Sequence, residues 1–304
     1  MAQERFLDEK KVADFWDDTR RNADPTDQTG YLADEWPRSL GHARFRGELK
    51  QVLGWLDELD APRGRCLDVG CGVGVWLGEL ARRYESAHGV DLSAEMVTSA
   101  RAGLAAAGLT NVTVTQQSIL ELPDDERYDL VFVGGVLMYV NDEDLSTMVA
   151  RLGRLLTPRG VLILRESTSS PNTWYRDTPL SPGLFARKDG PRRPYTAIYR
   201  PPTAYKLLAE QHGLDIVRCE PNPHYKLSDL TETWLNTINK ITFGTLARRH
   251  ALAETTARAI HALRWITLVP QYHLIRTLAP GTWKIGNWWT VCRPKPSLLA
   301  PGQP

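Results

Sequence analysis

Between residues 65 and 164, short apolar runs alternate with stretches in which apolar residues recur every three or four positions. The runs predict buried strands, and the stretches between them predict helices. Strands that alternate with helices at this spacing predict a mostly parallel sheet with helices on both faces. The predicted strands are Arg65–Val69, Ser86–Val90, Val112–Gln116, Tyr128–Val133 and Gly160–Leu164.

Helix signals surround these strands. Ser93 predicts the N-cap of a helix that ends near Ala107, where Gly108 follows. Asn141 predicts the cap of a helix that runs to about Leu156. Apolar spacing predicts three further helices, at residues 5–20, Phe45–Leu59 and Val75–Tyr84.

The alternation stops after Glu166. Residues 167–199 contain five prolines and are expected to form a loop. Proline at the start and glycine at the end predict a helix over Pro202–Gly213. Strands are expected at Asp215–Cys219 and Asn287–Cys292, and the region between them has helical character with a predicted cap at Ser228.

These elements predict four parts of the chain. Residues 1–60 are expected to form an N-terminal helical lid region, and residues 61–220 an α/β core. Residues 221–285 form a predicted helical insertion, and residues 286–304 the last strand and a tail.

Composition indicates a globular protein in a reducing compartment. Of 304 residues, 42% are hydrophobic and 24% charged, and the longest apolar runs are too short to span a bilayer. The first 17 residues are charged throughout, which does not resemble a secretory signal. The four cysteines lack the spacing of a metal site or a disulfide framework. We therefore expect a cytoplasmic protein without a bound metal or a transmembrane segment.

The near-neutral total charge of +1 conceals an asymmetry. Residues 171–304 carry 18 Lys and Arg against 8 Asp and Glu, whereas residues 1–170 carry 19 against 28. A net charge of +10 on the second part favours an anionic partner, although solvated basic helix faces would give the same count.

The sharpest chemical signal is the segment Leu67-Asp68-Val69-Gly70-Cys71-Gly72-Val73-Gly74, between a predicted strand and a predicted helix. Its glycines allow a tight turn and a close approach of the backbone to a ligand. Asp91 ends the next predicted strand, where its carboxylate can accept hydrogen bonds from both hydroxyls of a ribose. Each charge-assisted bond would contribute roughly 1.5–3 kcal/mol.

Here the chain resembles the class I S-adenosylmethionine-dependent methyltransferases of the small-molecule type. The acidic Asp68 and the GxGxG spacing separate it from dinucleotide dehydrogenases, because a pyrophosphate would repel that carboxylate. Three later segments match the family: residues 117–123, 128–140 and 155–164. The resemblance implies a Rossmann-like seven-stranded sheet with a reversed last strand.

The resemblance also implies the cofactor, S-adenosyl-L-methionine, with S-adenosyl-L-homocysteine as product. Ser118 stands where the family often has Asp to hold the adenine amino group, a role that Glu121 could compensate. The implied cofactor-binding residues are Asp68, Gly70, Cys71, Gly72, Gly74, Asp91, Leu92, Ser118, Ile119 and Val133.

The family places its acceptor pocket at the C-terminal ends of strands four and five. Glu166 is the preferred candidate for a general base, with a salt bridge to Arg165 or to another cation as the alternative. Tyr139 follows strand four and could instead pack as a pocket wall. His224 follows strand six and could instead be a surface loop residue.

Arginines and aromatic residues supply the candidate substrate-binding set. Arginine forks suit phosphate or carboxylate, so a small acceptor with an anionic head and an apolar body is expected, such as a prenyl diphosphate or a lipid of specialised metabolism. The helical insertion could cap this pocket, form a homodimer or rest on a membrane surface. The candidate substrate residues are Trp16, Tyr31, Tyr175, Arg176, Arg192, Arg193, Tyr199 and Arg200.

Other functions stay open on the sequence. Methylation of RNA or protein ranks lower, because no RNA-binding appendage is recognisable and Gly134-Gly135-Val136-Leu137 replaces the Asn/Asp-Pro-Pro-Tyr tetrad that marks such enzymes. A non-catalytic cofactor-binding protein and a nicotinamide dehydrogenase are further alternatives. The sequence does not say whether carbon, nitrogen or oxygen accepts the methyl group, nor the oligomeric state.

Overall fold

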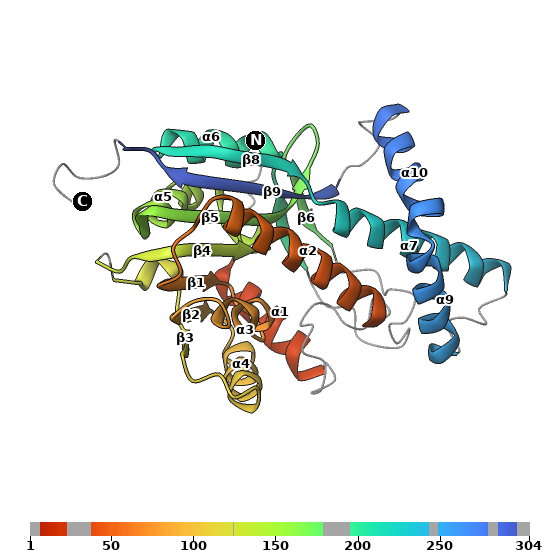
Figure 1. Cartoon of the computed structure of the whole chain (residues 1–304), viewed down its shortest axis with the longest axis horizontal. Helices are drawn as coiled ribbons and strands as arrows, with labels where there is room; N and C mark the ends of the chain where they lie inside the picture. The colour runs from red at the N-terminus through yellow and green to blue at the C-terminus, as the bar shows by residue number, and fades with distance from the viewer. Residues whose placement is uncertain are drawn as a thin grey trace.

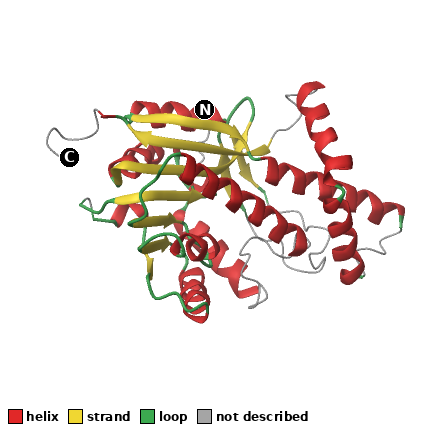
Figure 2. Cartoon of the chain, in the orientation of Figure 1, coloured by secondary structure: helices red, strands yellow, loops and turns green. Residues whose placement is uncertain are grey.

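The computed structural model describes residues 7–22, 38–123, 125–178, 195–242, 249–278 and 285–296. Its centre is a seven-stranded sheet in the order β3-β2-β1-β4-β5-β9-β8. β9 is antiparallel to both of its neighbours, and the other neighbouring strands pair in parallel. The predicted sheet with a reversed last strand is confirmed (Figures 1 and 2). The strands are β1 (Arg65–Val69), β2 (Ser86–Asp91), β3 (Val112–Gln116), β4 (Tyr128–Gly134), β5 (Leu156–Ser169), β8 (Leu214–Pro221) and β9 (Ile285–Pro294).

Helices cover both faces of this sheet. Apolar side chains of α2 (Arg38–Glu58), α3 (Val75–Ala81) and α4 (Ala94–Ala106) pack on one face. α5 (Asp142–Arg154), α6 (Pro202–Gln211) and the 3-10 turn η1 (Ile119–Glu121) pack on the other. Successive residues of β5 alternate between these faces, with Ile163 in the first cluster and Leu164 in the second.

The N-terminal segment 1–60 divides between two roles. The second half of α2 buries Val52, Trp55 and Leu56 against the sheet, so this part of the helix is a core layer. α1 (Glu9–Asn22) instead lies beside α4, and its Asp17 carboxylate accepts from the Ser93 hydroxyl and from the Glu95 amide. Among the described residues of this segment, α1 and the start of α2 line the cavity described below.

Two local predictions were wrong and a third held only in position. The expected loop 167–199 contains an antiparallel pair of strands, β6 (Trp174–Asp177) and β7 (Thr196–Tyr199). Asn141 is the N-cap residue of α5 as predicted, but its side chain bonds the backbone of Leu7 and makes no cap hydrogen bond. α7 (Pro223–Ile241) begins before Ser228, because Asn222 caps it by accepting from the amides of His224 and Tyr225.

The remaining helices form the insertion between β8 and β9. α9 (His250–Ala262) and α10 (Arg264–Leu278) pack against α7 at the end of the molecule away from the sheet (Figure 1). No described helix combines the length and the apolar character needed to cross a membrane.

Candidate functional site

A cavity of about 440 Å³ opens at the C-terminal ends of β1, β2, β4 and β5. Its glycine-rich wall is the turn between β1 and α3. Gly70, Gly72 and Gly74 have φ values of +66°, +54° and +83°, in the left-handed region that favours glycine. A methyl group on Gly70 would also collide with the Val136 side chain. The glycines of the sequence motif therefore stand where the backbone of this turn adopts positive φ values.

Asp91 lies next to that turn and lines the cavity. Its Oδ2 accepts from the Gly72 amide at 2.8 Å, and its Oδ1 accepts from the Ser93 amide at 2.9 Å. Burial raises the pKa of this carboxyl, while the same amides oppose the rise. A carboxylate held in this way keeps a fixed orientation and retains lone pairs for further donors, as a ribose diol requires.

Asp68 lies in the protein interior and not in the cavity wall. Its side chain is buried beneath the turn and is absent from the cavity lining, and among the described residues Oδ2 finds no hydrogen-bond partner. Burial, and next the nearby charge of Asp91, raise the pKa of Asp68 well above its ordinary value. Gly74 and Val133 also lie outside the lining.

The segment after β3 forms the next part of the wall. Ser118 caps η1, with its hydroxyl accepting from Leu120 N at 3.3 Å, while Glu121 accepts from Ser118 N at 2.9 Å. Glu121 thus holds the turn and is not among the lining residues. Ser118, Ile119 and Leu120 all face the cavity, as do Cys71 and Leu92.

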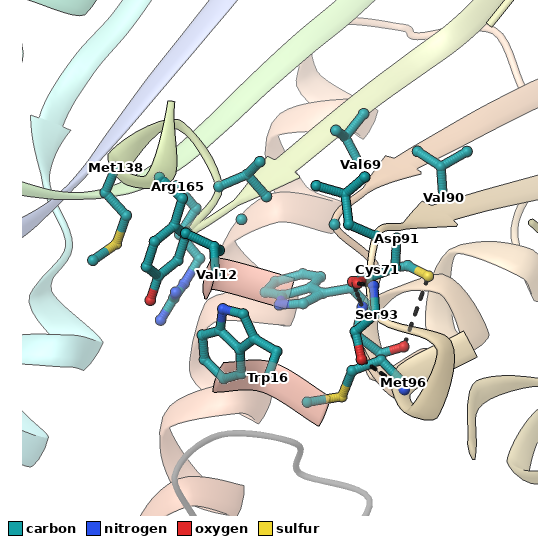
Figure 3. A pocket seen from close by; sticks show the side chains of 18 of the residues that line it. Val12, Trp16, Val69, Cys71, Val90, Asp91, Ser93, Met96, Met138 and Arg165 are labelled. Carbon is teal, nitrogen blue, oxygen red and sulfur yellow. Dashed lines mark hydrogen bonds between the residues drawn. The ribbon is translucent and has the colours of Figure 1, made fainter. Parts of the chain in front are cut away.

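α1 closes one side of the cavity with Val12, Ala13 and Trp16. Figure 3 shows Asp91, Cys71, Ser93 and Met96 on one side of this space, Arg165 and Met138 on the other, and Trp16 between them. The cavity therefore joins two chemically different ends.

Tyrosines dominate the second end. The end is lined by Tyr139, Tyr195 and Tyr199, whose hydroxyls form a hydrogen-bonded chain. The hydroxyl oxygens of Tyr139 and Tyr195 are 3.2 Å apart, and those of Tyr195 and Tyr199 are 3.1 Å apart. The Arg176 guanidinium lies over the Tyr195 ring, 5.2 Å from its centroid. Burial raises the pKa of Tyr139 and of Tyr195, so these hydroxyls are neutral hydrogen-bonding groups.

A buried ion pair forms the wall beside the tyrosines. Arg165 donates to both carboxylate oxygens of Glu48, each at 2.9 Å, and Asn222 donates to the same carboxylate at 2.8 Å. Arg44 lies 3.9 Å from Glu48 and also lines the cavity. Burial opposes ionisation of Glu48, but the charges of Arg165 and Arg44 hold its pKa below the ordinary value. Sequence analysis missed Glu48 and Arg44, because they lie in a helix with no recognisable motif.

Glu166 points to the opposite face of the sheet from Arg165. Its Oε1 accepts from the amides of Val136 and Leu137, at 3.0 and 3.2 Å. Glu166 is buried, and it is absent from the cavity lining. Burial raises its pKa to about 7, against those amide bonds. Glu166 thus holds the turn after β4 through these amide bonds, and Arg165 forms an ion pair with Glu48.

The other predicted residues fall in different places. His224 lies in the first turn of α7 with its ring against Gly47 of α2, and it does not line the cavity. Arg200 is buried and donates to the carbonyls of Leu137 and Val140, so it also holds the turn after β4. Tyr175 donates to Asp142 and lies outside the lining. Tyr31, Arg192 and Arg193 lie outside the described residues.

Comparison with known proteins points to one family. Residues 66–160 match a family model described as a methyltransferase domain. A demethylmenaquinone methyltransferase of Shouchella clausii is 30% identical over 159 residues, which cover 46% of this chain and 66% of that protein. A ubiquinone biosynthesis O-methyltransferase of Paracidovorax citrulli is 28% identical over 143 residues, covering 46% and 60%. The matches thus span less than two thirds of these relatives.

Solved structures share the fold. A SAM-dependent methyltransferase of Leishmania major superimposes with a TM-score of 0.53 at 20% identity, over 70% of this chain and 76% of that one. The matched domain, the sheet order and the glycine turn agree with the family predicted from the sequence. Residues 66–160 of the α/β core are thus similar to a methyltransferase domain, and the relatives that align with them are named as methyltransferases.

Proposed function

We propose that the chain transfers a methyl group from S-adenosyl-L-methionine to a small molecule. One observation carries the proposal: a single cavity joins the glycine turn and Asp91 to an end built from arginines and tyrosines. A donor bound at the first end and an acceptor bound at the second would meet near Trp16. The enzyme's main contribution would be to align the two reactants.

The residues at the first end fit the cofactor. The glycine turn allows close approach to the backbone, Asp91 offers a fixed carboxylate to the ribose hydroxyls, and residues 118–120 line the same cavity, where they would meet the adenine. When bound, the cofactor supplies an electrophilic methyl on a sulfonium, so the protein need not activate the donor. Ser118 uses its hydroxyl oxygen in the η1 cap, and backbone groups of the segment would therefore carry much of the adenine recognition.

The second end favours an acceptor with an anionic group and an apolar body. Arg44, Arg165 and Arg176 line it, and Glu48 is the acidic side chain paired within it. Guanidinium groups in a desolvated wall suit carboxylate or phosphate. The relatives named as quinone methyltransferases support a small-molecule acceptor.

We assign acceptor positioning to Tyr139. Its neutral hydroxyl belongs to the chain with Tyr195 and Tyr199, and its ring lies beside Trp16 at 5.9 Å. A hydroxyl fixed by its neighbours can orient an acceptor without removing a proton. Glu166 and Arg200 would act indirectly, because both form hydrogen bonds with the backbone of the 136–140 turn that carries Tyr139.

The test uses S-adenosylmethionine labelled in its methyl group with the purified chain and a fractionated host extract. We expect label in anionic, organic-extractable small molecules, lost in Asp91→Ala and lowered in Tyr139→Phe. Tyr175→Phe, outside the lining, is the matched control and should retain transfer. Label in RNA or protein would overturn the small-molecule acceptor, and no cofactor-dependent label in any fraction would overturn methyl transfer.

A further inference from the structure

One turn of α1 reaches both ends of the cavity. Phe15 and Trp16 contact tyrosine rings of the second end, whereas the next residue, Asp17, bonds to Ser93, a neighbour of Asp91 at the first end. Consecutive residues of a helix point about 100° apart, so three in a row can contact different neighbours. This turn therefore lies between the place proposed for the cofactor and the place proposed for the acceptor.

The contacts at the second end form a closed circuit of aromatic rings. The rings of Phe15, Trp16, Tyr139 and Tyr195 meet edge to face, with centroid distances between 5.3 and 6.1 Å. Edge-to-face contact is a preferred arrangement of aromatic rings, and each of these rings touches two others. Since Trp16 and both tyrosines line the cavity, the position of α1 fixes part of the acceptor wall.

Asp17 reaches the first end without lining the cavity itself. Its Oδ1 accepts from the Ser93 hydroxyl and, at 3.2 Å, from the Glu95 amide at the start of α4. Ser93 is 1% exposed and lines the cavity, and its amide donates to Asp91 Oδ1 at 2.9 Å. Two hydrogen bonds in succession therefore join α1 to the carboxylate that is proposed to hold the ribose.

Further hydrogen bonds hold α1 on either side of this turn. In the last turn of the helix, Arg20 Nε donates to Ser99 Oγ of α4 at 2.7 Å. Just before the helix, the backbone of Leu7 exchanges two hydrogen bonds with the Asn141 side chain, at 2.7 and 3.0 Å, and both residues are buried. α1 is thus attached both to α4 and to the residue that precedes α5.

We propose that Asp17 is a positioning residue, which fixes the aromatic wall beside Trp16 at a set distance from the cofactor held by Asp91. This role rests on the methyl transfer proposed above. Transfer requires that donor and acceptor are aligned, and a displacement of about 1 Å can lower the rate about 100-fold. Because Asp17 follows Trp16 directly, loss of its bond to Ser93 would let the wall shift relative to the ribose carboxylate.

The same contacts couple cofactor binding to the packing of α1 over the cavity. The packed helix holds Ser93 and closes one side of the cavity with Val12, Ala13 and Trp16. A coupling free energy is reciprocal, so a ligand that binds more tightly under the packed helix favours that packing by the same factor. We therefore expect S-adenosylhomocysteine to slow amide exchange in α1.

Hydrogen exchange of the full chain, with and without saturating S-adenosylhomocysteine, tests this role. In the wild type the ligand should slow exchange at residues 9–22 at least about fivefold. Asp17→Ala should lose this protection and bind the ligand at least about fivefold more weakly, while residues 70–74 stay protected. Asp17→Asn keeps the oxygen that accepts both bonds and should behave like the wild type. Asp14→Ala, at a 60% exposed side chain of the same helix, is the matched control and should also do so.

Two results would overturn the role of Asp17. The first is equal protection of α1 by the ligand in the wild type and in Asp17→Ala, or protection in neither. A merely structural role predicts equal protection, with only a lower melting temperature in the variant. The second is an Asp17→Asn variant as defective as Asp17→Ala. A wild type that does not bind S-adenosylhomocysteine would overturn the proposed transfer and this role with it, whereas binding without protection of α1 overturns the role alone.

Discussion

At the scale of single residues, neighbours in the sequence take opposite roles. Arg165 and Glu166 follow each other in β5, so their side chains leave the sheet on opposite faces. Arg165 enters the cavity wall and pairs with Glu48, and Glu166 bonds the amides of Val136 and Leu137 behind it. The strand period alone predicts this separation, but identifying Glu48 as the partner requires a contact across 117 positions.

Glu166 should make stability depend on pH. Its pKa is raised by burial to about 7. Between about pH 4.5 and 7 the unfolded carboxyl is ionised while the folded one holds its proton, so the wild type loses stability as the pH rises. Glu166→Gln keeps the acceptor oxygen and cannot ionise. Chemical unfolding should show the variant about 2–3 kcal/mol more stable at pH 8, with the advantage gone at pH 4.

The Glu48 pair should be costly to break. Glu48→Gln leaves the buried charge of Arg165 without its carboxylate, which typically destabilises a protein by about 3 kcal/mol. The matched control is Glu58→Gln, which breaks an exposed pair with Arg218 and should cost under about 1 kcal/mol. Urea denaturation measures both. Equal losses in the two variants would show that the buried pair contributes little.

At the scale of elements, local sequence signals predicted the strands and helices of the α/β core but not the added strand pair β6 and β7. β1 is buried along four of its five residues, and the edge strand β3 alternates valine with polar residues; both patterns are typical of strands, and both strands match their predicted bounds. Ser93 caps the start of α4, and Gly108 follows its end, both as expected. These signals can be read from the sequence because a cap acts within one turn of the helix. The pair β6 and β7 was missed, because its strands are four residues long and a proline-rich segment separates them.

The cap of α7 shows a signal that the sequence contained. Asn222 followed by Pro223 is the usual start of a helix, with an Asn cap and proline at the first position. Ser228 was chosen because an apolar stripe follows it, although that stripe is only partly buried: Leu230 is 8% exposed and Ile241 70%. The helix therefore begins one and a half turns earlier, where it also joins Asn222 to Glu48.

Two glycines of α2 should respond oppositely to alanine. A methyl on Gly47 would overlap the His224 ring of α7, whereas Gly54 has open space around it. We expect Gly47→Ala to destabilise the protein by about 1–3 kcal/mol through overpacking. Gly54→Ala should stabilise it by about 0.5–1 kcal/mol through helix propensity. Thermal unfolding compares them, and a Gly47→Ala variant as stable as Gly54→Ala would contradict the packing.

At the scale of the whole molecule, charge is divided between two places. Two arginines, Arg44 and Arg165, lie beside Glu48 in the cavity wall. Both come from the first part of the chain, which is acidic overall. Part of the basic excess of the second part lies on α9 and α10, outside the cavity. The charge count favoured an anionic partner, but it could not separate a pocket from a surface, because sequence position does not give spatial position.

The central claim is that the glycine turn and Asp91 hold S-adenosylmethionine, and calorimetric titration with S-adenosylhomocysteine tests it most directly. Asp91→Asn replaces one accepting oxygen by an NH2 group, which cannot accept a hydrogen bond from the backbone amides of Gly72 or Ser93. We expect the variant to bind S-adenosylhomocysteine at least about tenfold more weakly, because one or more charge-assisted hydrogen bonds are lost. The wild type should bind one equivalent and should not bind NAD. Absence of binding by the wild type, or equal affinity in Asp91→Asn, would contradict the account.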